Sequence, residues 1–213
     1  MEEEKSSKKL HQEGKNMSLK NQSVSKRTKT IVRVAVLSAL SAILYALPGI
    51  PIIPPIYKLD FSGICVFLGA MWLGPIEGII IALFKDITGL VHSSSAGVGE
   101  LADFICSVAF ILPIAFFRKK ADTGLKKAVV LVLSVLLMAL AGAAANYWIL
   151  IPFYVKGTMT IEKIVGMIAK VIPAVDSLGK LILFATVPFN LLKGAIISVI
   201  VMILDWRLEK IVR

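Results

Sequence analysis

Three polar side chains within apolar segments are the residues best suited to bind a ligand. Asn190 and Lys193 are three positions apart, so on a helix they share one face. Asn146 lies in the preceding apolar segment. Together, two amides and an ammonium group supply hydrogen-bond donors and one class of acceptor. This set suits a polar, planar, largely uncharged ligand better than it suits a bare ion.

The charge of Lys193 also permits a purely structural role. A lysine within an apolar span is costly, and it usually faces the protein interior or a cavity. It can therefore be held in an ion pair instead of contacting a ligand. The acidic residues available as partners near the same ends of the spans are Asp60, Glu100 and Asp103.

The composition of the chain indicates which class of protein positions these side chains. Of its 213 residues, 57% are hydrophobic and 18% charged, yet the formal net charge is +10. Such a chain is either a nucleic-acid binder or a membrane protein oriented by its basic loops. The basic residues stand at the borders of apolar segments, without a basic groove or interleaved aromatic residues. This pattern favours a membrane protein and argues against nucleic acid as a partner.

The apolar segments predict an all-α integral membrane protein with six transmembrane helices. The pair Gly74-Pro75 would interrupt a single helix over 61–91, so two spans form a tight hairpin there. With both termini cytoplasmic, most of the 24 Lys and Arg fall on the cytoplasmic side of the cell membrane. The predicted spans are about 31–47, 61–74, 75–91, 99–117, 128–153 and 188–206.

The regions outside the spans predict a tail and a lid. Residues 1–30 are basic and hold almost no apolar run, so we expect a disordered cytoplasmic tail before a membrane domain at 31–213. Four prolines make the outer loop 48–60 stiff and extended rather than helical. The second outer loop, 154–187, contains a helix-like cap, and Pro188 suits the first turn of the last span. We expect the two loops to cover an outward-facing pocket.

No motif for catalysis, metal binding or ATP hydrolysis occurs. The sequence lacks a phosphate-binding G-x-x-x-x-G-K-[ST] loop, an H-E-x-x-H pattern and a Ser/His/Asp arrangement. Cys65 and Cys106 lie in apolar spans, where small buried side chains are the usual role of cysteine. We therefore expect no enzyme activity, no metal and no cofactor, and we expect another subunit to supply energy if a solute is concentrated.

Four short motifs together resemble those of a known family. The motifs are Lys58-Leu-Asp-Phe61, Leu73-Gly-Pro75, Gly97-Val-Gly-Glu-Leu-Ala-Asp-Phe104 and Pro188-Phe-Asn-Leu-Leu-Lys-Gly194. They resemble the riboflavin-specific S component (the substrate-binding subunit) of energy-coupling factor (ECF) transporters, from about residue 30 to residue 206. The resemblance implies a six-helix S-component fold that binds riboflavin near the outer face. It also implies association with a transmembrane coupling (T) subunit and two cytoplasmic ATPases.

The resemblance also implies roles for individual residues. It assigns flavin contacts to Asn190, Lys193 and Asn146. The lid loop would include the stretch Leu59, Asp60 and Phe61.

Two alanines of the first span have two possible roles. Ala35 and Ala39 are four residues apart, a spacing that lets another helix approach closely. From the spacing alone, packing inside the bundle is as good an explanation as contact with a partner. The resemblance favours contact with the coupling subunit.

Two other functions remain as alternatives. The protein can be an S component for another vitamin, which would share the fold and differ only in the pocket. It can also be a self-sufficient secondary transporter that uses Lys85, Asp86 and Lys193 as a charged pathway. Lys85 and Asp86 are adjacent and therefore point to different sides of a helix, and the sequence leaves their role open.

Overall fold

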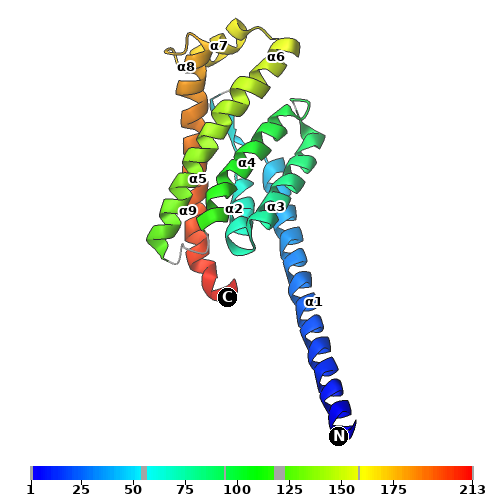
Figure 1. Ribbon diagram of the computed structural model, residues 1–213. Helices are drawn as coiled ribbons and strands as arrows, with labels where there is room; N and C mark the ends of the chain where they lie inside the picture. The colour runs from blue at the N-terminus through cyan, green and yellow to red at the C-terminus, as the bar shows by residue number, and fades with distance from the viewer. Residues whose placement is uncertain (1, 54–56, 94, 118–122, 158, 213) are drawn as a thin grey trace.

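The computed structural model is a helical bundle with one small β-hairpin (Figure 1). It describes residues 2–53, 57–93, 95–117, 123–157 and 159–212. The helices are α1 (Glu2–Ala46), α2 (Gly63–Trp72), α3 (Pro75–Gly89), α4 (Val98–Phe117), α5 (Gly124–Ala145), α6 (Ile151–Gly157), α7 (Ile161–Ala169), α8 (Leu178–Leu181) and α9 (Val187–Val212). A 3₁₀ turn, η1 (Leu90–His92), follows α3, and two π-helical turns are η3 (Asn146–Leu150) and η4 (Ile182–Thr186).

The N-terminal segment is helical, where the sequence predicted disorder. Helix α1 is continuous from Glu2 to Ala46, and its first half projects away from the bundle (Figure 1). The segment is rich in Lys and Glu, which are good helix formers even without a core to pack against. Low apolar content by itself does not predict this local conformation.

The proline-rich outer loop forms a hairpin, so the fold is not all-α. Strands β1 (Ile50–Ile53) and β2 (Tyr57–Leu59) pair antiparallel, with Pro51 opposite Lys58. Proline lacks the N–H that a central strand must donate, and it is tolerated here because each strand has a neighbour on one side only. The prolines excluded a helix as expected, but they did not exclude a strand.

The predicted break between the second and third helices is present. Helix α2 ends at Trp72 and α3 begins at Pro75. Between them Gly74 has φ 154°, a conformation that side-chain-bearing residues rarely adopt. The glycine makes the turn, and the proline begins the next helix.

Pro188 does not begin a helix, contrary to the sequence prediction. Residues 178–212 are helical without interruption, and Pro188 follows the π turn η4 by two residues. Pro152 follows η3 in the same way within the helical stretch 124–157. A proline inside a helix loses one backbone hydrogen bond and crowds the carbonyl four residues earlier. In both helices the widened turn contains that carbonyl, so the helix continues through the proline.

Four helical stretches are long and apolar enough to cross a bilayer, within the part of the chain that the structure describes. Helices α2 and α3, with 10 and 15 residues, are shorter than the ~20 residues of a straight crossing. The six-span topology therefore stays a prediction. The four stretches are Val24–Ala46, Val98–Phe117, Gly124–Gly157 and Leu178–Arg207.

Two apolar clusters hold the bundle together. The larger joins α2, α3, α4, α5 and α9 and includes the stacked rings of Phe67 and Phe110, whose centroids are 3.6 Å apart. The smaller joins the hairpin and α7 to α6, α8, η4 and the start of α9, and it includes the fully buried Ile168. Helix α7 and the hairpin lie at the end of the bundle opposite the start of α1 and the end of α9 (Figure 1).

Replacing Gly78 with alanine should destabilise the α2–α3 hairpin. A Cβ at this position would lie 2.6 Å from the Cβ of Ala70 and 2.9 Å from its Cα, so the two helices would have to separate. We expect Gly78→Ala to cost about 1–3 kcal/mol and to lower the Tm of the purified protein. Gly166→Ala in α7 is the matched control, because its Cβ would meet nothing within 4 Å. Equal Tm values for the two variants would contradict this account of the helix crossing.

Candidate functional site

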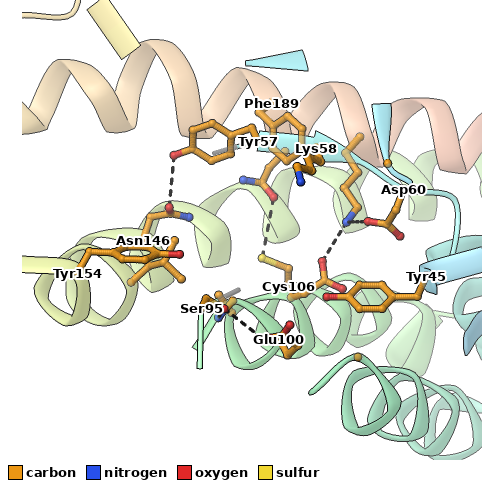
Figure 2. A pocket seen from close by; sticks show the side chains of 18 of the residues that line it. Tyr45, Tyr57, Lys58, Asp60, Ser95, Glu100, Cys106, Asn146, Tyr154 and Phe189 are labelled. Carbon is orange, nitrogen blue, oxygen red and sulfur yellow. Dashed lines mark hydrogen bonds and ion pairs between the residues drawn. The ribbon is translucent and has the colours of Figure 1, made fainter. Parts of the chain in front are cut away.

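A cavity of about 630 Å³ lies between the hairpin, α4, η3, α7 and α9 (Figure 2). Four of the six predicted binding residues border it, namely Asn146, Asn190, Lys193 and Asp60. The other two do not. The side chain of Leu59, in β2, is buried and that of Phe61 is half-buried, and neither residue is part of the cavity lining.

Both asparagine amides are fixed by the helix that carries them. Nδ2 of Asn146 donates to the carbonyl oxygen of Gly142 at 2.8 Å, and Nδ2 of Asn190 donates to that of Thr186 at 2.9 Å. Each bond uses one of the two amide hydrogens, so each amide keeps one donor. Among the described residues, Oδ1 of Asn190 has only the weak Sγ–H donor of Cys106 nearby, at 3.9 Å. The pair thus presents oriented donors and an available acceptor to the cavity.

A glycine on α5 makes room for the second amide. A Cβ at Gly142 would lie 2.6 Å from Nδ2 of Asn190 and 2.8 Å from its Cγ. Any larger residue would turn the amide away from its present position. Gly142 therefore belongs to the site although it offers no functional group.

Tyr57 is a site residue that sequence analysis missed. Its hydroxyl lies 2.5 Å from Oγ1 of Thr186 and donates to Oδ1 of Asn146 at 3.3 Å. Burial raises the pKa of Tyr57 to about 12, so its hydroxyl stays neutral. Its ring packs against Phe189, with centroids 5.0 Å apart. A lone aromatic residue at the end of a proline-rich loop was the only indication in the sequence.

Lys193 is held by two carboxylates. Its Nζ donates to Oδ2 of Asp60 at 2.7 Å and to Oδ1 of Asp103 at 2.9 Å. The other oxygen of Asp60 accepts from the backbone N–H of Ser62 at 3.1 Å and from its hydroxyl. The ion pair considered from the sequence is thus present, and Asp60 serves as the partner of Lys193 at the cavity wall.

A second buried lysine extends this cluster. Nζ of Lys85 bonds to Oδ2 of Asp103 and lies 2.7 Å from Oδ1 of Asp86. It also lies 4.9 Å from the ring centroid of Tyr45 on α1, within the range of a cation–π contact. Adjacent residues on a helix point to different sides, but the side chains of Lys85 and Asp86 still reach each other and form an ion pair. The cluster thus consists of charged residues that pair with one another, namely Lys85, Asp86, Asp103, Lys193 and Asp60.

The two alanines of α1 lie on its outer surface. Ala35 and Ala39 are exposed, whereas Ser38 and Ser41, on the other face of the helix, are buried against the bundle. Packing within the chain therefore does not explain the small side chains.

Removing the charge of Lys193 should destabilise the protein. Lys193→Met would leave Asp60 and Asp103 buried with only Lys85 to balance them, and breaking a buried pair costs about 3–5 kcal/mol. We expect a lower Tm, partly restored in the double variant with Asp60→Asn. The control is Lys180→Met, which removes an exposed pair with Asp176 and should cost less than about 1 kcal/mol. A Tm for Lys193→Met equal to that of the control would contradict the pairing.

Comparison with known proteins places this geometry in a family. The family model for "ECF transporter, substrate-specific component" matches residues 29–204. The chain is 29% identical over 191 residues to "Riboflavin transporter RibU" of Staphylococcus aureus (strain TCH60), covering 88% of this chain and 94% of that protein. It is 29% identical over 189 residues to "Riboflavin transporter FmnP" of Bacillus subtilis (strain 168), covering 86% and 93%.

A solved structure agrees with the family match. It is described as "Structure and mechanism of the S component of a bacterial ECF transporter", and it superposes with a TM-score of 0.69 at 28% identity. The match covers 88% of this chain and 99% of that one. Together with the apolar helices, these matches make the protein a multi-pass membrane protein. The chain belongs to the substrate-specific (S) components of ECF transporters.

Proposed function

We propose that this chain binds riboflavin in the cavity and serves as the capture subunit of an ATP-driven importer. The observation that carries the proposal is the convergence of Asn146, Asn190 and Lys193 on one cavity. Its volume of about 630 Å³ lies within the usual range of small-molecule sites. The two relatives named above are riboflavin transporters, so the chain acts in transport and not as an enzyme.

The chemistry of the cavity supports this ligand. One edge of the isoalloxazine ring of riboflavin alternates carbonyl groups with an N–H group. The free amide hydrogens of Asn146 and Asn190 suit the carbonyls, and Oδ1 of Asn190 suits the N–H. The ring faces and the dimethylbenzene end need apolar walls, which Phe189 and Ile164 supply. Riboflavin is here the cargo, and the proposal invokes no cofactor.

The direction of transport and the partners complete the proposal. The cavity faces the outside of the cell, both termini are cytoplasmic, and the loops 48–60 and 154–187 cover the ligand. Residues from both loops, among them Tyr57 and Ile164, border the cavity, which supports a covering role. A transmembrane coupling subunit and two cytoplasmic ATPases then drive the loaded bundle to release riboflavin inside, as the family implies.

Riboflavin should bind tightly to the purified protein, and Gly142→Ala should weaken that binding. The added Cβ would displace the amide of Asn190 and remove its bonds to the ring, so we expect a Kd about 5- to 100-fold higher by flavin fluorescence quenching. Gly157→Ala is the control, because nothing lies within 4 Å of its Cβ. A wild-type protein that ignores riboflavin but binds thiamine or pantothenate would be an S component for another vitamin. Uptake by vesicles without ATPase subunits would instead indicate a secondary transporter.

Enlarging the exposed alanines of α1 should prevent assembly without affecting the ligand. With Ala35→Leu and Ala39→Leu together, the coupling subunit could not approach the helix closely, so co-purification should be lost. Riboflavin affinity should stay at the wild-type value, because neither residue borders the cavity. Val36→Leu, also exposed on α1, should assemble normally. Assembly of the double variant, or loss of its riboflavin binding, would refute the proposed interface.

A further inference from the structure

The buried charged cluster contains more acidic than basic side chains. Two lysines, Lys85 and Lys193, pair with three carboxylates, those of Asp60, Asp86 and Asp103. If all five groups are ionised, one negative charge is left without a counter-charge. An uncompensated charge in the interior of a helix bundle is strongly destabilising. The folded protein therefore needs either a bound cation or a bound proton at this place.

The surrounding helices supply no further cation. The ionisable side chains on this side of the bundle are Lys85 and Asp86 on α3, Tyr45 on α1, Asp60 before α2, Asp103 and Glu100 on α4, and Lys193 on α9. Helix α2 itself carries no charged side chain. Lys58, the other lysine at the cavity, is exposed and forms no ion pair with a described carboxylate. The excess negative charge thus stays within the cluster.

Of the three carboxylates in the cluster, that of Asp86 receives the fewest hydrogen bonds. Asp103 accepts from Lys85 through Oδ2 and from Lys193 through Oδ1, and Asp60 has the donors described above. Oδ1 of Asp86 lies 2.7 Å from Nζ of Lys85, but at too oblique an angle for a hydrogen bond. Its Oδ2 accepts no hydrogen bond from any described residue. Since Asp86 is only 5% exposed, water has little access to replace these bonds.

The arrangement of the carboxylates favours a proton over a metal ion. A metal ion such as Ca²⁺ or Mg²⁺ requires several oxygen ligands around one point. Among the described residues, no group of three His, Cys, Asp or Glu side chains could hold one. A proton requires a single carboxylate oxygen, and the protonated group is neutral. The free Oδ2 of Asp86 meets this requirement.

We propose that Asp86 is a proton-binding site, where one proton held on the carboxyl group balances the charge of the buried cluster. Asp60 and Asp103 then remain ionised and pair with the two lysines. Neither Asp86 nor Lys85 belongs to the cavity lining, so the site is separate from that of the ligand. The inference therefore does not depend on the proposed function.

Infrared spectroscopy of the purified protein observes this proton directly. A protonated carboxyl group absorbs at a higher wavenumber than an ionised carboxylate, so its band should be present at neutral pH. Labelling the aspartate carboxyl groups with ¹³C should shift the band, which distinguishes it from a band of Glu100. The shifted band should be lost in Asp86→Asn. It should remain in the control Asp176→Asn, which changes an exposed carboxylate that is paired with Lys180.

Thermal unfolding of two asparagine variants tests the same site independently. Asp86→Asn replaces one neutral group with another, so its Tm at neutral pH should be no lower than that of the wild type. The gap should widen with rising pH, by about tenfold in the unfolding constant per pH unit, while the folded wild type retains a proton that its unfolded chain has lost. Asp103→Asn removes a charge that both lysines share and should lower the Tm.

Each other outcome has a defined meaning. The absence of an aspartate band at neutral pH would overturn the proposal, as would an Asp86→Asn variant that is destabilised as much as Asp103→Asn. A wild-type Tm that Na⁺ raises relative to choline, with the rise lost in Asp86→Asn, would show a bound cation in place of the proton. If Asp86→Asn fails to fold, the ¹³C-labelled wild type still decides the question by the presence or absence of its band.

Discussion

The burial of two lysines within the helix bundle constrains the structure around them. Lys85 and Lys193 cannot remain charged in an apolar interior unless carboxylates lie beside them. Those carboxylates come from α3, α4 and the end of the hairpin, while Lys193 comes from α9. Charge balance therefore constrains how α3, α4, α9 and the end of the hairpin lie relative to one another. The cavity lies where these four parts meet.

Prolines and glycines shape the same region. Each π turn precedes a proline by two residues, and Asn146 begins one turn while Thr186 ends the other. π turns inside α-helices are often found at functional sites, where the widened backbone changes the direction of side chains. Gly142 then allows the amide of Asn190 to fit between α5 and α9. The binding geometry proposed here thus depends on backbone features as much as on the polar side chains.

Local patterns in the sequence predicted the features that depend on neighbouring residues alone. The break at Gly74 and the polar residues of the cavity wall were found because Gly-Pro pairs and amides within apolar spans stand out. Pro188 was misplaced because its effect depends on a neighbouring π turn that no single residue marks. The partners of Lys193 could not be chosen, because the acidic residues near the span ends were equivalent until the helices packed. The hairpin was missed because proline excludes helix without specifying strand.

The position of Asp60 has a kinetic consequence. This residue joins the hairpin to α2, and its two oxygens are divided between Ser62 and Lys193. Any movement that lifts the hairpin from the cavity must separate a buried ion pair or displace α9 with it. Buried pairs add little to net stability compared with apolar packing, yet separating one leaves two charges uncompensated. In the proposed function, where the hairpin covers the ligand, this pair would act mainly on the rate of opening and so on the lifetime of the bound ligand.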